Sequence, residues 1–304
     1  MRMIQIEQLS PKWQPRRHLF TSIGSLIFKV NLWCWLALAL AVPARAEMFT
    51  WHVVPPPGMT KSELNCERNF PATNGVLVLC PGMNGDGAIL AKDSAWRAFA
   101  KERGLGLVGV SFSSPPELLY GDPAIGYYYP EQGAGDVLIR GLRELYGKDV
   151  KLFLYGFSGG AQFCARFTDQ HPDRVLSWAA YAACFWADHV SANPSSPPGI
   201  VTCGEFDADR YGPAFGYFQQ GRRKDARWTW VSVGNIGHVR HKRLEEFIRS
   251  YFSAVLAGKF DQSVWLDAET MEPTTEDERL LTPALSVWLP TPEVKEAWLK
   301  LHHP

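Results

Sequence analysis

A serine stands between glycines in the stretch VKLFLYGFSGG, where an apolar run typical of a buried strand stops abruptly. Residues 156–160 match the pattern GxSxG. In a sharp turn from a strand into a helix, side chains two positions either side of the serine would collide with their neighbours, and glycine removes that collision. Such a turn presents the hydroxyl of Ser158 at the N-terminus of a helix, where backbone N–H groups favour developing negative charge. Ser158 is therefore a candidate nucleophile.

A short pattern also arises by chance in glycine-rich turns, so the interpretation depends on partners for the serine. A serine nucleophile needs a base within hydrogen-bond reach and a carboxylate that orients the base. In the strand, turn and helix arrangement that carries GxSxG, they follow in the order serine, acid, histidine. The stretch GIVTCGEFDADR supplies Asp207 just after a strand-like run, and we favour it as the acid. Asp209 in the same loop and Asp188 after the preceding strand are the alternatives.

The base is expected beyond the last strand of the pattern. The stretch WTWVSVGNIGHVRH offers His238 directly after Gly237, where the chain can bend before the final helix of the repeat. His241 is a rival, but its position predicts that it already belongs to that helix. We therefore predict that Ser158, Asp207 and His238 form a catalytic triad.

Acyl transfer also requires an oxyanion hole, which is a pair of backbone N–H groups aimed at the charge of a tetrahedral intermediate. The amide of Gly159, directly after the nucleophile, is one expected donor. The second is expected from the loop PGMNGDG, residues 81–87, which follows the strand-like run GVLVLC and is rich in glycine, as close backbone approach demands. We predict Met83 as that donor, with Asn84 as the alternative.

Strand-like and helix-like stretches alternate between residues 75 and 256, and this alternation must position the candidate residues. Short apolar runs bounded by Gly, Pro or charge predict strands at 75–80, 105–112, 150–156, 175–182, 199–204 and 228–234. Helices are predicted at about 88–103, 131–146, 159–170, 213–225 and 241–256. Such alternation implies right-handed crossovers and a parallel sheet covered on both faces. The predicted fold class is α/β, with a mostly parallel doubly wound sheet, preceded by one antiparallel strand from MFTWHVV.

Composition restricts the possible functions. The chain has 304 residues, of which 46% are hydrophobic and 20% charged, as in ordinary globular proteins. No basic patch indicates a nucleic-acid partner. Five of the 6 cysteines follow residue 46, and none shows CxxC spacing, so we expect no structural metal. Cys80, Cys184 and Cys203 lie in or beside strand-like runs and are interpreted mainly as small core residues.

Residues 1–46 have the order of a secretory signal peptide. A basic opening is followed by the apolar run NLWCWLALALAV and the small-residue close ARA. The apolar run is short for a membrane-spanning helix, which favours a cleaved leader with no stable membrane insertion afterwards; an uncleaved anchor and a misplaced start codon are the alternatives. We therefore predict an exported protein, periplasmic or secreted. Loss of the leader removes six of the 31 basic but one of the 31 acidic residues and leaves a mildly acidic chain.

From about residue 49 to 258 the chain resembles the α/β-hydrolase superfamily. Within it, GFSGGAQF followed by HPDRV loosely resembles secreted esterases related to polyhydroxybutyrate depolymerases and feruloyl esterases, although those relatives often begin the oxyanion loop with His-Gly, where this chain has Pro81 and Gly82. The resemblance implies hydrolysis of a carboxylic ester through an acyl-enzyme on Ser158, without metal or organic cofactor.

Clues to the substrate come from YGDPAIGYYYPEQG, residues 120–133, which concentrates tyrosines after a strand, on the edge where open parallel sheets bind ligands. We predict that Tyr127, Tyr128 and Phe157 contact a small-molecule or polymeric ester. The tyrosines could equally cover the core beneath a loop.

The predicted domains are a catalytic domain at 47–258 and a C-terminal extension at 259–304. The extension breaks the strand and helix alternation but carries Trp265, Trp288 and Trp298, which are seldom left in water, so we expect it to pack on the domain with a closing helix near PEVKEAWLKLHH. Two other functions fit the same residues: a serine peptidase of this fold, or a catalytically silent binding protein that keeps it.

Overall fold

The computed structural model describes residues 48–67, 70–120 and 125–302. The predicted leader at residues 1–46 lies outside this range. Within the described residues, no helix combines the length and apolarity that crossing a membrane would require.

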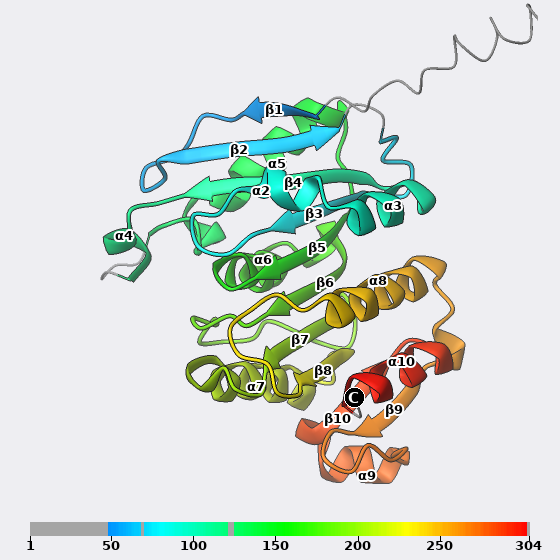
Figure 1. Ribbon diagram of the computed structural model, residues 1–304. Coiled ribbons are helices and arrows are strands. Elements are labelled where there is room, and N and C mark those ends of the chain that lie inside the picture. The colour runs from blue at the N-terminus through cyan, green and yellow to red at the C-terminus, as the bar shows by residue number, and fades with distance from the viewer. Residues whose placement is uncertain (1–47, 68–69, 121–124, 303–304) are drawn as a thin grey trace, which may run out of the picture. The chain divides into compact units, whose positions relative to one another are not determined.

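The central element is an eight-stranded sheet with the order β1-β2-β4-β3-β5-β6-β7-β8 (Figure 1). Its strands are β1 (Met48–His52), β2 (Lys61–Glu67), β3 (Val76–Cys80), β4 (Gly106–Ser113), β5 (Leu152–Phe157), β6 (Val175–Tyr181), β7 (Gly199–Gly204) and β8 (Trp228–Val233). The pairs β1–β2 and β2–β4 are antiparallel, and all others are parallel. The predicted fold class, a mostly parallel sheet flanked by helices, is confirmed.

Helices lie in most of the connections between the parallel strands and after the last of them, whereas the connection from β6 to β7, which the structure describes throughout, has none. They are α2 (Gly87–Ala91), α3 (Ser94–Glu102), α4 (Pro116–Tyr120), α5 (Ala134–Tyr146), α6 (Gly159–Gln170), α7 (Ala208–Arg223) and α8 (Lys242–Ala257), followed by α9 (Glu276–Leu281) and α10 (Pro292–His302). Helices α3 and α8 lie on one face of the sheet, where the Arg249 guanidinium stacks 4.9 Å above the ring of Trp96 (Figure 1). Helices α6 and α7 lie on the other, where Tyr217 donates to Asp169 over 3.2 Å.

Two helix boundaries differ from the sequence prediction. The helix expected at 88–103 is two helices, because the carboxylate of Asp93 accepts hydrogen bonds from the amides of Ala95 and Trp96 and caps the start of α3. Helix α7 begins at Ala208, directly after Asp207, and includes Pro213, so the predicted start at residue 213 was wrong. The earlier start places the candidate acid at a helix N-terminus.

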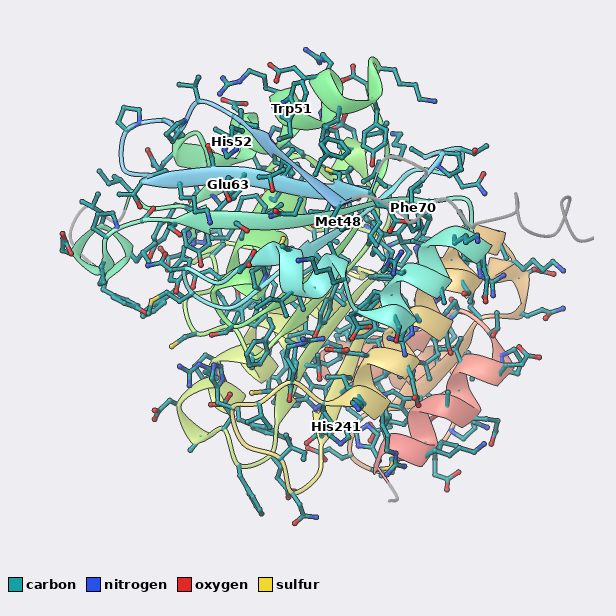
Figure 2. All side chains as sticks on the ribbon, turned by 45° about the horizontal axis from the view of Figure 1, so that its top comes forward. Met48, Trp51, His52, Glu63, Phe70 and His241 are labelled. Carbon is teal, nitrogen blue, oxygen red and sulfur yellow. The ribbon has the colours of Figure 1, made fainter. Side chains whose placement is uncertain are left out.

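Strand β2 was not predicted, because KSELNCE is polar. The polar side chains Ser62 and Asn65 are nevertheless buried, and Asn65 donates to the Gly109 carbonyl and to Ser111 on the neighbouring strand. Beside β2, Trp51 and His52 belong to β1 at the outer edge of the sheet, whereas His241 lies at the start of α8 (Figure 2).

The C-terminal residues pack on β8 and α8. An antiparallel pair, β9 (Val264–Asp267) and β10 (Ser286–Leu289), precedes α10. The indole of Trp298 donates to the Trp230 carbonyl over 2.7 Å, and the hydroxyl of Thr229 donates to the Trp288 carbonyl. Trp288 and Trp298 are buried. The fully buried Arg222 donates from Nε to the Ser286 carbonyl over 2.7 Å, which fastens β10 to α7.

The register of the parallel strands brings five loops to one edge of the sheet. Gly156 pairs with Cys80 on one side and with Ala180 on the other, Tyr181 pairs with Thr202, and Gly204 pairs with Val233. The carboxyl ends of β3, β5, β6, β7 and β8 are therefore nearly level. Because ligand sites of open parallel sheets lie at this edge, the residues that follow these strands are the candidates for a site.

Candidate active site

Ser158 occupies the turn between β5 and α6 in a conformation that few non-glycine residues adopt. Its φ is 53° and its ψ is −122°. A Cβ on Gly156 would lie 2.2 Å from the Gly160 carbonyl oxygen, and a Cβ on Gly160 would lie 2.3 Å from the Cys80 carbonyl oxygen. The backbones of β3, β5 and α6 therefore touch at this turn, and neither flanking glycine has room for a side chain. We call residues 156–160 the nucleophile turn.

Three of the predicted residues form one continuous hydrogen-bond chain. The Nε2 atom of His238 lies 3.0 Å from Ser158 Oγ, and its Nδ1 atom lies 2.6 Å from Asp207 Oδ2. A carboxylate only accepts hydrogen bonds, so Nδ1 carries the proton and Nε2 is left to accept the proton of the serine hydroxyl. This arrangement can draw a proton from Ser158 as its oxygen attacks an electrophile.

The carboxylate of Asp207 is buried and bound at both oxygens. Asp207 is 4% exposed, and its Oδ1 atom accepts a hydrogen bond of 2.9 Å from Nη1 of Arg210. A buried carboxylate is stable only when it is paired and hydrogen-bonded, and Arg210 and His238 meet that need together. Arg210 was not singled out in the sequence, although its spacing from Asp207, three residues on in a helix, is that of a possible ion pair.

The rival residues lie elsewhere. Asp209 and Asp188 are both exposed, and His241 occupies the N-cap position of α8 without a capping hydrogen bond from its side chain. The structure therefore brings Asp207, and neither alternative acid, to His238.

The loops that carry Asp207 and His238 are bound to each other directly. We call residues 234–241 the histidine loop. The amide of Phe206 donates to the Ile236 carbonyl over 2.8 Å, and the amide of Asn235 donates to the Glu205 carboxylate over 2.9 Å. A Cβ on Gly204 would lie 2.3 Å from the Ile236 carbonyl oxygen, so glycine is required for this contact.

Phe157, predicted to contact substrate, lies against the imidazole of His238. The two ring centroids are 4.9 Å apart and the planes are inclined by 28°. Phe157 also contacts the ring of Tyr181, with centroids 5.3 Å apart. Phe157 therefore forms one wall of the space in which His238 sits.

The loop at residues 81–87 passes beside Ser158. A Cβ on Gly82 would lie 3.6 Å from the Cβ of Ser158. Among the described residues, neither the amide of Met83 nor that of Gly159 donates to another backbone group. Both amides are thus available to a ligand, as an oxyanion hole requires.

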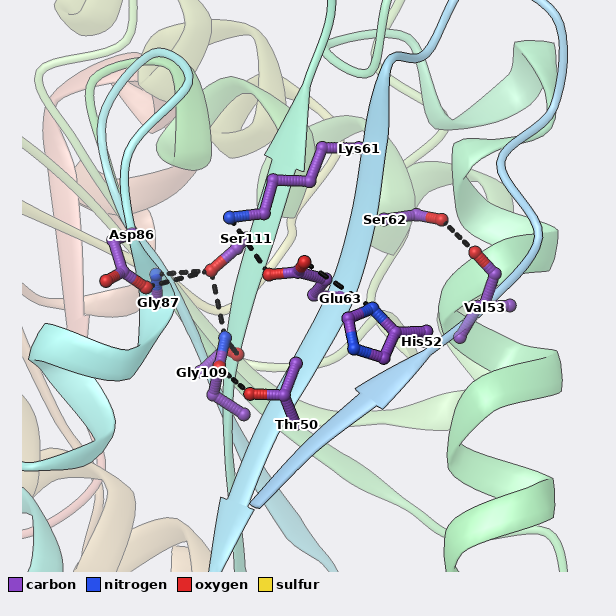
Figure 3. Close-up of polar contacts among 11 residues, drawn as sticks. Thr50, His52, Val53, Lys61, Ser62, Glu63, Asp86, Gly87, Gly109 and Ser111 are labelled. Atoms are coloured by element: carbon purple, nitrogen blue, oxygen red, sulfur yellow. Dashed lines mark hydrogen bonds and ion pairs between the residues drawn. The ribbon is translucent and has the colours of Figure 1, made fainter. Parts of the chain in front are cut away.

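The conformation of this loop is fixed by Asn84 and Asp86. Asn84 has a φ of 53°, and its side chain both donates to and accepts from the backbone of Ser114. Asp86 accepts from Ser111 over 3.0 Å, and Ser111 in turn accepts from the amide of Gly87 (Figure 3). Ser111 also accepts a hydrogen bond from the side chain of Asn65 on β2. Residues of β2 and β4 therefore stabilise the conformation of the loop at residues 81–87.

The sequence left two roles open for Tyr127 and Tyr128, contact with a substrate and cover of the core. Each residue is 3% exposed, which favours cover of the core for most of each ring. The hydroxyl of Tyr127 accepts from the amide of Asn84 over 3.0 Å, so it supports the loop at residues 81–87. The ring of Tyr128 would lie 2.2 Å from a Cβ on Gly159. Burial raises the pKa of both phenols, so both remain neutral. Most of each ring covers the core.

Exposed aromatic residues near this edge include Phe206, which directly precedes Asp207 and is 65% exposed, and a pair formed by Tyr120 and Phe185. Tyr120 and Phe185 have ring centroids 5.4 Å apart and are 54% and 40% exposed. The hydroxyl of Tyr120 lies 3.0 Å from the sulfur of Met83, and Met83 is itself 44% exposed. The exposure of Phe185 could not be predicted from the sequence, because an aromatic residue after a strand carries no signal of its exposure.

No cluster of three or more metal-ligating side chains occurs among the described residues. The five cysteines that the structure describes are unpaired; of the three interpreted as core residues, Cys80 and Cys203 are buried, whereas Cys184 is partly exposed. Burial raises the pKa of the Cys203 thiol to about 12.

No protein-family model matches the chain, and no curated protein matches it. Solved structures do. An esterase from Pyrococcus furiosus matches with a TM-score of 0.52 at 11% identity, covering 70% of this chain and 93% of that one. An esterase from Pyrobaculum calidifontis matches with a TM-score of 0.50 at 14% identity, covering 79% and 95%. A thermophilic carboxylesterase cloned from a metagenomic library matches with a TM-score of 0.50 at 15% identity, covering 78% and 98%. The chain has the α/β-hydrolase fold.

Proposed function

We propose that this protein is a serine hydrolase that cleaves carboxylic esters. The observation that carries the proposal is the continuous chain from Ser158 Oγ through His238 to Asp207, with separations of 3.0 and 2.6 Å. The esterases named above have the same fold, which favours ester hydrolysis over other acyl transfers.

In the first step, Ser158 Oγ attacks the carbonyl carbon of the ester while His238 Nε2 takes the hydroxyl proton. Asp207 stabilises the imidazolium, and Arg210 holds the second carboxylate oxygen and so fixes the orientation of the acid. The amides of Met83 and Gly159 donate to the oxyanion of the tetrahedral intermediate.

Collapse of that intermediate transfers the proton from His238 to the alcohol, which leaves, and an acyl-enzyme remains on Ser158. Water then attacks the acyl-enzyme with His238 again as base, and the acid product is released. Each step uses only groups of this chain and water.

The test is to purify the chain from Glu47 onward and to measure hydrolysis of p-nitrophenyl acetate and butyrate together with labelling by a fluorophosphonate. We expect turnover and labelling, and loss of both in Ser158→Ala. Ser250→Ala, an exposed serine on α8, is the matched control and should behave as the parent. Cleavage of peptides without cleavage of esters would favour a peptidase instead, and failure of every acyl substrate and of the probe would favour a silent binding protein.

Export is part of the proposal and is supported by the order of residues 1–46. The expected result is a protein in the periplasm or medium whose first residue is Glu47, determined by N-terminal sequencing. Recovery of the intact first 46 residues from the exported fraction would contradict cleavage.

A further inference from the structure

A buried carboxylate lies next to the active site but outside the hydrogen-bond chain of Ser158, His238 and Asp207. Glu245, in the first turn of α8, is 5% exposed. Its Oε1 atom accepts a hydrogen bond of 2.9 Å from the hydroxyl of Tyr155, which is fully buried on β5 three residues before Ser158. Desolvation raises the pKa of Tyr155, so the phenol stays protonated and donates.

The same carboxylate oxygen binds Arg240. Nε and Nη2 of Arg240 each lie 2.7 Å from Glu245 Oε1. Arg240 follows His238 by two residues, so this ion pair fastens the histidine loop to α8 and, through Tyr155, to the strand that carries the nucleophile. A buried carboxylate needs a cation and hydrogen bonds, so the pairing commits Arg240 to one position.

A second contact restrains Val239, which lies between His238 and Arg240 in the chain. The hydroxyl of Tyr181 on β6 donates to the carbonyl of Val239 over 2.6 Å. On the other side of His238, a Cβ on Gly237 would meet nothing within 4 Å, but the carbonyl oxygens of Ile236 and Gly237 lie 2.3 and 2.7 Å from where a Cβ on Gly204 would stand. His238 is therefore held on one side by the contacts of residues 235–237 with the loop of Asp207, and on the other side by whatever fixes residues 239 and 240.

We propose that Glu245 is a positioning residue for His238, acting through Arg240. This inference rests on the proposed function for its effect on catalysis. A histidine that must lie 3.0 Å from the nucleophile tolerates little displacement, because a shift of about 1 Å can cost on the order of 100-fold in rate.

The first measurement compares Glu245→Gln with Glu246→Gln, its exposed neighbour on the same helix. Glutamine keeps the size of Glu245 but removes the charge that binds Arg240. We expect kcat for p-nitrophenyl butyrate to fall by about 10- to 100-fold in Glu245→Gln with KM within about twofold, and no change in Glu246→Gln.

Arg240→Gln and Arg240→Lys change the other partner of the same ion pair. Because the side chain of Arg240 is partly exposed, these variants are expected to fold even if Glu245→Gln does not. Arg240→Gln should lose as much kcat as Glu245→Gln. Arg240→Lys keeps the charge without the paired N–H groups and should restore part of the loss. A lower melting temperature with unchanged kcat in Glu245→Gln and Arg240→Gln would mean that the network is only structural and would overturn the proposal.

The second measurement needs no substrate. Proton NMR should detect the Nδ1–H of His238, hydrogen-bonded to Asp207, as a low-field resonance in the parent protein that disappears in His238→Gln. We expect it to be broadened or lost in Glu245→Gln and retained in Glu246→Gln. If no acyl substrate is cleaved but the resonance responds in this way, the ester hydrolase proposal fails while the positioning role stands. A resonance and kcat identical in all variants would reject the positioning role.

Discussion

The nucleophile turn and the histidine loop contribute to one hydrogen-bond chain but are held in place by different forces. In the nucleophile turn, close backbone contact leaves no room for a Cβ at Gly156 or Gly160. In the histidine loop, a Cβ on Gly237 would meet nothing within 4 Å, and most of the restraints are polar contacts of the loop with Phe206, Tyr181 and Glu245, beside one close contact with Gly204. The first region is therefore fixed by exclusion of volume, and the second mainly by hydrogen bonds and an ion pair.

This difference predicts how each region fails. A region fixed by sterics should resist changes of charge and break when atoms are added. A region fixed by hydrogen bonds should accept added atoms where space exists and lose function when one partner is changed.

The largest effect is expected from Asp207→Asn, which changes the carboxylate that binds His238 of the histidine loop. The amide cannot hold His238 in the required tautomer, so kcat should fall by about 10³- to 10⁴-fold, with the fold unchanged. Asp209→Asn changes an exposed residue two positions away and should stay within about twofold of the parent. Equal losses in the two variants would mean that the geometry around Asp207 has no bearing on catalysis. Steady-state kinetics with p-nitrophenyl butyrate measure both.

Gly160→Ala tests the region fixed by sterics. The added Cβ would lie 2.3 Å from the Cys80 carbonyl oxygen, so the free energy of unfolding should fall by about 3 kcal/mol. Gly216→Ala is the control: it lies inside α7 with nothing within 4 Å of its Cβ and should gain about 0.5 to 1 kcal/mol. Urea unfolding followed by circular dichroism gives both values, and tolerance of Gly160→Ala would break the comparison.

A pH-dependent effect of intermediate size is expected near the end of α6, the helix that follows the nucleophile turn. Burial raises the pKa of Asp169 from 3.8 to about 6. Ionisation is therefore costlier in the folded than in the unfolded protein, and the destabilisation grows between the two pKa values and is complete above the higher one. Asp169→Asn should stabilise the protein by about 1 to 2 kcal/mol at pH 8 and by nothing at pH 3.

Urea unfolding at the two pH values checks this prediction, and Asp209→Asn serves again as the control for removal of one exposed charge. A stabilisation by Asp169→Asn that is the same at both pH values would contradict the electrostatic cause.

The smallest effect is expected from Gly237→Ala in the histidine loop. Because no atom lies within 4 Å of the new Cβ, stability should change by less than about 0.5 kcal/mol and kcat by less than about threefold. Gly204→Ala is the opposite case, since its Cβ would lie 2.3 Å from the Ile236 carbonyl oxygen and would push the histidine loop away. Thermal melts and kinetics of the pair show whether space alone decides the outcome.

The same contrast explains what could be predicted from the sequence. The steric requirement of the nucleophile turn involves only five consecutive residues, so its glycines indicate the turn in the sequence. The strands that end beside it were predicted because their apolar runs are also local patterns. The order of acid and histidine along the chain pointed to Asp207 and His238, which the structure places in contact.

Long-range polar partners could not be predicted in this way. Nothing in the sequence shows that Glu245 faces Tyr155, because the two lie 90 residues apart and each is an ordinary residue of its helix or strand. The polar strand β2 was missed because its buried Ser62 and Asn65 are satisfied by partners on other segments. The start of α7 was misplaced because Pro213 usually marks a helix start, and here it lies in the sixth position of the helix.

The burial of Arg222 has a consequence for biosynthesis. This guanidinium is 0% exposed and its acceptors include both oxygens of Ser286, which is translated 64 residues later. Until Ser286 leaves the ribosome, the Arg222 guanidinium has the Ala226 carbonyl and the Asp225 carboxylate as partners but lacks the two oxygens of Ser286 that complete its burial. The final packing of α7 against β10 is therefore expected only after residue 286 has been synthesised, late in the folding of the chain.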